Sequence, residues 1–569
     1  MAEPAITRHF ATITGGRWGA RQVHYRRAGR GPVVLCLHQS PLSSLDMLAT
    51  MTRWRPHLTC IAPDTPGFGL SDPLGVPHAE MDDFADAVVE FMDALGVART
   101  AVYGFHTGAM IALALAARHP QRISCAVANG VVLLTDAERD DFVQHYLPPL
   151  RPSWDGAHLA WLWARLREQK IFFPWYRASA AARLPVDMAS PAALQDALLD
   201  FMRSGDHYRV GYRAAFTLRS ADTLRHAATP LLATAAATDV LSQQLPRIRD
   251  ASPQVTVQPG GTPDETLDLG RRFIKRQARE RIGAPVAAAA LRGVMRQDFI
   301  TVPGGQLRLR RNDDAEGLPV LLLHDAYGSV DTLRATAGGF IGRRPVLALD
   351  LPGHGESDAA PLRGRPSIAA HARTVRAALD ALGLAHCEVI GMGSGATVAL
   401  ALALQAPARV GRLTLIGLPM PDAAARRSAV RHGLPDIRPE WHGGHLLHGW
   451  HMLRDRRFYR PWFDRSRAGV LRATPRVDAD DIQTELLDLL RSRGMWRRTA
   501  LAALTHPVAP QLKRLLKLRV PTRFAAAPAD PYGPDTLRAA RAFPSLPFIA
   551  LPDDPAEWAM TLSPPETLA

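Results

Sequence analysis

The chain alternates short apolar runs with longer stretches of helical periodicity, and this alternation predicts its secondary structure. Segments near 7–14 and 22–27 alternate apolar and polar residues, as strands with one buried face do. The runs Val33–Leu37, Thr59–Pro63 and 100–103 are apolar throughout, which is typical of strands buried on both faces. Buried strands separated by helical stretches indicate βαβ units. The sequence therefore predicts an α/β fold with a mostly parallel sheet flanked by helices.

The same order of features recurs 287 residues later. The sequence LPPLRPSWDGAHL from Leu147 matches LPDIRPEWHGGHL from Leu434, and four further identities keep the same offset: Trp163, Arg167, Pro174 and Trp175 match Trp450, Arg454, Pro461 and Trp462. A constant offset across separate motifs indicates duplication of one domain-sized unit.

The repeat places two domains in tandem. We expect a first domain over 1–284, a linker over 285–297 and a second domain over 298–569. Stretches rich in tryptophan and arginine, about 135–222 and about 421–503, interrupt the sheet pattern and are interpreted as inserted helical caps. The apolar run 286–291 also fits a last helix of the first domain. We expect the two domains to pair within the chain, with a homo-oligomer as a further possibility.

Composition narrows the class of partner. The formal net charge is +14, but the arginines that carry it are spread along the chain and are enriched together with alanine and proline, as in GC-rich bacterial coding. No basic stripe or known nucleic-acid module is present, so a small-molecule substrate is expected rather than nucleic acid.

The four cysteines sit in apolar runs, and no leader or 18-residue apolar span occurs. These features predict a cytoplasmic protein without membrane attachment.

Three motifs follow one another in each half. A strand ending in His38 or His324 precedes a D-x-P-G-x-G-x-S-D loop ending at Asp72, or its counterpart ending at Asp358, and then a Gly-x-x-x-Gly turn that opens an alanine-rich helix. This ordered set resembles the α/β-hydrolase superfamily, twice over. The resemblance implies two capped α/β-hydrolase folds. It also implies a nucleophile at the centre of each glycine turn, an acid after a late strand and a histidine after the last strand.

The turns Gly104-Phe-His-Thr-Gly108 and Gly391-Met-Gly-Ser-Gly395 lack that nucleophile. In the first half His106 holds the central position and Asp239 fits the acid, but no histidine occurs between His226 and His324. We interpret His106 and Asp239 as a catalytic dyad in which the aspartate orients the imidazole. The alternative is a decayed turn whose histidine makes only a structural hydrogen bond.

Further site residues of the first half are carried over from the resemblance by position. The backbone amides of Gln39 and Thr107 match the oxyanion-hole donors. Ser40 is a candidate pocket residue or a loop cap, and the cap residues Trp154, His158 and Trp163 are candidates for the pocket wall or for cap packing.

The second half looks degenerate. Gly393 occupies the central position of the turn and Asp530 fits the acid, but no histidine follows Asp530. The neighbouring Ser394 is one residue too late to act as the nucleophile. The histidines of the second cap, at three-residue steps from His442 to His451, spread over more than one helix face, so no metal site and no cofactor are expected.

These observations favour an enzyme acting on a small organic ester or carbonyl compound in the first domain. Its reaction would be hydrolysis by activated water, or proton transfer or C–C cleavage without a cofactor. The alternative is a non-catalytic pseudo-hydrolase that binds a ligand or serves as a scaffold.

Overall fold

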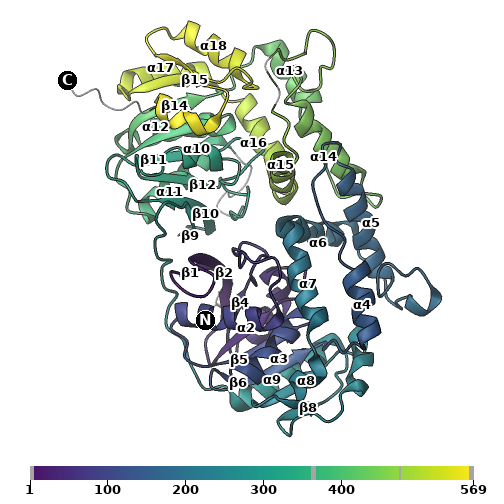
Figure 1. The fold of residues 1–569 in the computed structure, drawn as a ribbon. Coiled ribbons are helices and arrows are strands. Elements are labelled where there is room, and N and C mark those ends of the chain that lie inside the picture. Colours follow the sequence, from purple (N-terminus) through teal and green to yellow (C-terminus); the bar gives the residue numbers. More distant parts are fainter. Residues whose placement is uncertain (1–4, 360–366, 473, 475, 563–569) are drawn as a thin grey trace. The chain divides into compact units, whose positions relative to one another are not determined.

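The computed structural model describes residues 5–359, 367–472, 474 and 476–562, and the chain divides into two compact units (Figure 1). Unit 1 comprises the chain up to Arg151 together with Trp161–Ala289, and unit 2 comprises Pro152–Ala160 and the chain from Ala290 onward. Residues 278–295 form neither helix nor strand. The sequence interpretation placed the whole stretch 135–222 in the first domain, and its domain bounds stay a prediction.

Unit 1 is built on one eight-stranded sheet of order β1-β2-β4-β3-β5-β6-β7-β8. Strand β2 pairs antiparallel with β1 and β4, and the remaining neighbours are parallel. The strands are β1 (Thr7–Ile13), β2 (Arg21–Ala28), β3 (Val33–Leu37), β4 (Thr59–Pro63), β5 (Thr100–Phe105), β6 (Ile123–Asn129), β7 (Leu231–Thr234) and β8 (Val255–Val257).

The helices of unit 1 cover the sheet or form the insertion after β6. The covering helices are α1 (Leu48–Trp54), α2 (Met81–Ala94), α3 (Thr107–Arg118) and α9 (Pro263–Gln277). The insertion contains α4 (Asp136–His145), α5 (Ala157–Ile171), α6 (Pro191–Ser204), α7 (Tyr208–Thr217) and α8 (Ser220–Arg225), and α5 begins in the segment assigned to unit 2.

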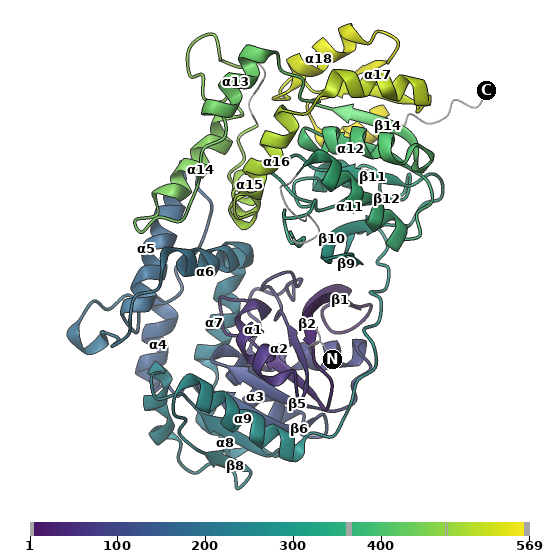
Figure 2. The ribbon, with the colours of Figure 1, turned by 180° about the vertical axis from the view of Figure 1, so that it is seen from behind.

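Strand β3 shows why the central strands of the sheet are apolar throughout. Its residues alternate between two cores: Val33, Leu35 and Leu37 pack with residues of α2 and α3, whereas Val34 and Cys36 pack with residues of α1 and α9. These helices are labelled in Figure 2. A strand covered on both faces needs apolar residues at successive positions, unlike the half-exposed strands at a sheet edge.

Unit 2 repeats this topology. Its sheet has the order β16-β15-β14-β13-β11-β12-β10-β9, with β10 antiparallel to β9 and β12. The strands are β9 (Arg296–Val302), β10 (Gly305–Asn312), β11 (Val320–Leu323), β12 (Val346–Leu349), β13 (Cys387–Met392), β14 (Val410–Ile416), β15 (Thr522–Ala526) and β16 (Phe548–Ala550). The predicted fold class, two mostly parallel sheets flanked by helices, is confirmed.

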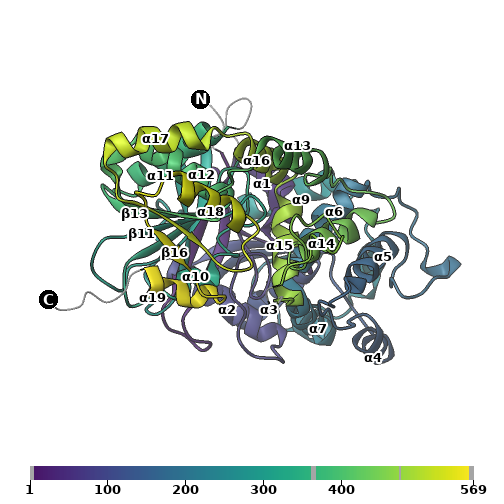
Figure 3. The same ribbon diagram turned by 90° about the horizontal axis from the view of Figure 1, so that it is seen from above.

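The helices of unit 2 fall into the same two groups. Those on the sheet are α10 (Arg334–Gly338), α11 (Ile368–Ala381), α12 (Ser394–Gln405), α17 (Val508–Leu518), α18 (Gly533–Ala542) and α19 (Trp558–Leu562), with α12 beside α17 (Figure 3). The insertion holds α13 (Ala423–His432), α14 (Gly444–Asp455), α15 (Ala479–Arg491) and α16 (Met495–Leu504). Among all described residues, no helix has the length and apolarity needed to cross a membrane.

The D-x-P-G-x-G loops act as structural turns. Asp64 is buried after β4 and accepts hydrogen bonds from the amides of Ser44 and Leu70 and from the His24 ring, at 2.7 to 2.8 Å. A side chain at Gly69 would meet the Asp64 carboxylate at 2.0 Å, so glycine is required there. Asp350 does the same in unit 2, where it accepts from the amides of Val330 and Glu356.

Candidate active site

The turn between β5 and α3 holds His106 in a strained backbone conformation. Its φ of 49° and ψ of −108° lie outside the regions that most side chains adopt. The flanking glycines allow the close approach: a Cβ at Gly104 would lie 1.9 Å from the Gly108 carbonyl oxygen, and a Cβ at Gly108 would lie 2.2 Å from that of Leu37. The sharp strand-to-helix turn expected from the motif is therefore present.

His106 and Asp239 lie in direct contact although 133 residues separate them. Nε2 of His106 is 2.8 Å from Oδ2 of Asp239, and the other carboxylate oxygen accepts the Leu241 amide at 2.8 Å. Gly130 keeps the space beside the ring open, since a Cβ there would meet His106 Cδ2 at 2.4 Å. The ring thus has one nitrogen fixed by the carboxylate, while no hydrogen bond from the described residues reaches Nδ1.

The electrostatics of the pair favour an ionised aspartate. Burial would raise the pKa of Asp239, but the hydrogen bond and charge of His106 and the Leu241 amide outweigh it and hold the pKa below its ordinary value. The Asp239 side chain is 9% exposed and the His106 side chain 25% exposed. The imidazole therefore remains accessible to a small molecule.

The two amides proposed as oxyanion donors differ in their surroundings. The Gln39 amide donates a long hydrogen bond of 3.4 Å to Asp46 Oδ2, and burial raises the pKa of this carboxyl. Thr107 begins α3, and its hydroxyl accepts the Ser40 amide at 3.3 Å. The Ser40 hydroxyl itself is buried, and none of the described residues forms a hydrogen bond with it. Asp46 was missed in the sequence, because nothing local marks its approach to the Gln39 loop.

The three cap residues named from the sequence lie in unlike environments. Trp163 is 2% exposed and Trp154 is 67% exposed. His158 is buried, and its Nδ1 accepts the Ser153 amide at 3.1 Å. Trp154 and His158 belong to the segment assigned to unit 2, where Trp450 donates its ring N–H to the Trp154 carbonyl. Their pocket role stays a prediction.

The matching turn of unit 2 is filled by an acidic side chain that the sequence interpretation missed. Gly393 has φ 55° and ψ −120°, almost the conformation of His106. Where its Cβ would stand, Oδ1 of Asp325 lies 2.4 Å away. This oxygen accepts the amides of Ser394 and Ala326, both at 2.8 Å. The carboxylate of Asp325 thus occupies the space next to the start of α12.

A second acid and an arginine complete this cluster. Arg456 donates to Asp325 Oδ2 at 3.2 Å and lies 3.6 Å above the Tyr327 ring. Burial, and then the charge of Asp325, raise the pKa of Asp530 to about 6. The sequence did contain signals for this cluster. Asp325 stands where the first half has Gln39, and each follows the strand-end histidine directly. Arg456 stands where the first half has Gln169, at the duplication offset.

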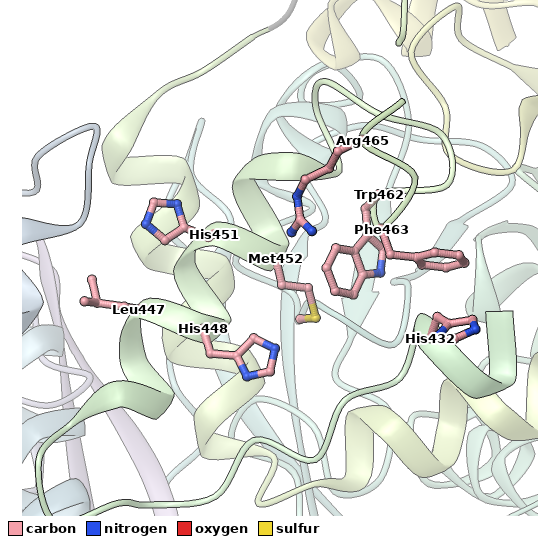
Figure 4. A pocket seen from close by; sticks show the side chains of 8 residues that line it. All are labelled: His432, Leu447, His448, His451, Met452, Trp462, Phe463 and Arg465. Atoms are coloured by element: carbon pink, nitrogen blue, oxygen red, sulfur yellow. The ribbon is translucent and has the colours of Figure 1, made fainter. Parts of the chain in front are cut away.

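The cap histidines of unit 2 face different environments. His445 is buried and its Nδ1 accepts the Glu440 amide at 3.1 Å, whereas His448 and His451 are exposed on α14. Figure 4 shows these two with His432, Trp462 and other side chains around a surface pocket. Among the described residues, no group of three histidine, cysteine, aspartate or glutamate side chains is placed to hold a metal ion.

The comparison with protein families agrees with this architecture. The family described as alpha/beta hydrolase fold matches residues 32–257 and 319–442, more than half of the chain, and the chain belongs to that family. Its two units are tandem α/β-hydrolase folds.

Individual relatives match over short stretches. The chain is 34% identical over 113 residues to haloalkane dehalogenase 2 of Mycobacterium tuberculosis, covering 20% of this chain and 37% of the relative. It is 37% identical over 112 residues to a 2-hydroxymuconate semialdehyde hydrolase of Pseudomonas putida, covering 19% and 40%. The chain thus spans less than half the length of these relatives. An epoxide hydrolase structure from Vigna radiata aligns at 18% identity and a TM-score of 0.36, covering 48% of this chain and 98% of that one.

Proposed function

We propose that unit 1 is a hydrolytic enzyme in which His106 is the base and Asp239 its orienting acid. The observation that carries the proposal is the 2.8 Å contact between His106 Nε2 and Asp239 Oδ2 at the centre of the turn. The proposed substrates are small organic esters or activated carbonyl compounds. The two named relatives that share sequence with this chain are a hydrolase and a dehalogenase.

The chemistry follows from the ring's two nitrogens. Asp239 accepts a hydrogen bond from the Nε2–H group, which leaves Nδ1 unprotonated and able to take a proton from water. The resulting hydroxide adds to the substrate carbonyl carbon, and the carbonyl oxygen gains the negative charge. The Thr107 amide at the start of α3 is the proposed donor to this oxyanion, joined by Gln39 once its long bond to Asp46 breaks. The protonated imidazole then returns its proton to the leaving alkoxide.

The strained backbone of His106 supports a functional role for this residue. A side chain at this φ and ψ costs about 1 to 3 kcal/mol, which glycine avoids. The second unit has glycine at its equivalent position, Gly393, in nearly the same conformation. A histidine kept at a cost, bonded to a buried acid and still accessible, is consistent with catalysis.

The test is a panel of small esters and carbonyl compounds assayed with wild type and variants. We expect His106→Ala to lower kcat/KM about 100-fold or more, as general-base contributions do, and Asp239→Asn to lower it at least tenfold. The matched control is His226→Ala, because His226 is an exposed histidine of the same unit. Equal turnover by His106→Ala and wild type would contradict the proposed catalytic dyad.

The same site could instead perform proton transfer or C–C cleavage without a cofactor. In both reactions Nδ1 of His106 would abstract a proton from the substrate rather than from water. Solvent-exchange measurements on a carbonyl compound with an acidic C–H distinguish this reaction, since His106→Ala would abolish deuterium incorporation.

A non-catalytic role is the second candidate, and the contact between Asp46 and the Gln39 amide favours it, because that contact engages a proposed oxyanion donor. In this case compounds bind to unit 1, but none of the panel is turned over by wild type. Asp46→Asn keeps the size and removes the charge, so a gain of turnover in that variant would indicate a blocked enzyme rather than a scaffold.

We also propose a cytoplasmic location and a small-molecule substrate. The four cysteines are buried as free thiols, which suits a reducing compartment. Pairing of the two domains and homo-oligomer formation stay predictions.

A further inference from the structure

We propose that unit 2 binds a small organic carboxylate in the cavity under its own cap. The cavity has a volume of about 90 Å³ and is lined by both the cap and the sheet domain of unit 2. Tyr327 and Tyr532 come from loops after β11 and β15, and Arg456, Arg460, Trp462 and Phe463 come from the chain after α14. This site is separate from the proposed catalytic dyad, and the inference does not depend on it.

Arg460 provides the cationic group for an anion. Its Nη2 donates to the backbone carbonyls of Asp530 and Pro528, and no described residue accepts a hydrogen bond from its Nη1. Main-chain carbonyls orient the guanidinium, and the charges of Asp530 and Asp535 also act on it. An accessible N–H of this charged group can donate to a carboxylate oxygen, and such charge-assisted hydrogen bonds are among the stronger ones.

Arg456 completes the polar wall, but its charge is already balanced. It pairs with Asp325 and stacks on Tyr327, so its position is fixed from two sides. The Asp325 carboxylate fills the space beside the Ser394 amide, which excludes a ligand from that position. The carboxylate of a ligand is therefore directed to Arg460, while the rings of Trp462 and Phe463 offer apolar surface to its alkyl part.

The arginines are particular to the second unit. At the duplication offset the first unit has Gln169 for Arg456 and Phe173 for Arg460, whereas Trp462 matches Trp175. The aromatic wall is thus shared by both copies and the cations are not. This difference indicates that the two caps recognise ligands of different charge.

The cavity volume sets the size of the ligand. A volume of about 90 Å³ leaves room for a small ligand. Short-chain monocarboxylates such as propionate match this size, and their charge and alkyl group suit Arg460 and the aromatic wall.

The experiment is calorimetric titration of the full chain with propionate, and with propionamide as the uncharged analogue of equal size. We expect propionate to bind and propionamide to bind at least tenfold more weakly. Arg460→Gln should weaken propionate binding at least tenfold. The control Arg427→Gln removes an equal charge from an exposed position on α13 and should leave the affinity unchanged.

A second variant keeps the test decisive if Arg460→Gln does not fold. Ala429→Leu retains both arginines and adds bulk at the cavity wall, so it should also lower propionate affinity. Three results would overturn the proposal: no propionate binding by wild type, equal binding of propionamide, or unchanged affinity in a folded Arg460→Gln or Ala429→Leu protein.

Discussion

Asp239 and Asp530 occupy equivalent positions, but a different neighbouring side chain shifts the pKa of each in the opposite direction. Asp239 follows β7 and Asp530 follows β15, the matching strands of the two sheets. Asp239 faces the His106 ring, which lowers its pKa. Asp530 is buried near the carboxylate of Asp325, which contributes to raising its pKa to about 6. The acid at this position therefore loses its proton more readily than usual in unit 1 and less readily than usual in unit 2.

The raised pKa of Asp530 predicts a pH-dependent stability. Its ordinary value is 3.8, so the folded chain favours the protonated form and this contribution is fully present below about pH 4. It is lost as the pH rises through 6, at a cost of about 3 kcal/mol for a shift of about two units. Asp530→Asn should therefore raise the unfolding free energy at pH 8 by about 2 to 3 kcal/mol.

Urea unfolding at pH 4 and pH 8 measures this effect. The variant and wild type should have nearly equal stability at pH 4, where both side chains are uncharged. An equal difference at both pH values would assign the effect to packing rather than to ionisation.

At the residue scale, the sequence predicted the pair His106 and Asp239. In the α/β-hydrolase superfamily the order of the catalytic residues along the chain is constant, and it identifies both positions. The sequence did not predict Asp46 or Asp325. Asp325 lies in the loop after β11 and Asp46 in a single 3₁₀ turn, Ser44–Met47, after β3, and periodicity does not encode the direction of a side chain in such short segments. The difference between Gln39 and Asp325 at matching positions was nevertheless visible in the sequence.

At the scale of elements, the turn from β5 to α3 depends on backbone contact. A Cβ at Gly104 would lie 1.9 Å from the carbonyl oxygen of Gly108 and 2.6 Å from the Ala109 amide nitrogen. Both atoms belong to backbone at the buried start of α3, so they cannot move aside as a flexible side chain can. The glycine is needed for space, not for its φ.

This contact predicts that Gly104→Ala destabilises unit 1 by more than about 3 kcal/mol, as strained overpacking of a core does. The control is Gly383→Ala, at φ +68° with no heavy atom within 4 Å of the added Cβ, which should cost about 1 kcal/mol from strain alone. Chemical denaturation of both variants measures the difference, and equal losses would contradict the proposed steric cause.

The strands were the elements best predicted from the sequence. Both-face burial makes β3 and β4 continuous apolar runs, and the observed bounds Val33–Leu37 and Thr59–Pro63 equal the expected ones. The assignment of Pro152–Ala160 to unit 2 was not predictable, because the sequence repeat marks equivalent positions and not the contacts that each copy makes.

At the scale of the whole molecule, duplication has preserved the scaffold and changed the charge at its centre. Both units keep a strand-end histidine whose Nε2 accepts an amide at 2.9 Å: His38 from Thr65 and His324 from Leu351. The central space differs, since unit 1 places an imidazole there and unit 2 places the Asp325 carboxylate. A shared fold therefore does not imply a shared reaction.

This divergence predicts that serine cannot restore conventional catalysis in unit 2. In Gly393→Ser the new Cβ would lie 2.4 Å from Asp325 Oδ1 and would also adopt a strained φ of about 55°, so stability should fall by at least about 1 to 3 kcal/mol. The double variant Gly393→Ser with Asp325→Gly removes the clash and should recover part of this loss.

Neither protein should react with a fluorophosphonate probe, because the sequence has no histidine after His506 to activate the serine. Labelling at position 393 in either variant would show that another group acts as the base, and unit 2 would then be a latent serine hydrolase rather than a binding domain.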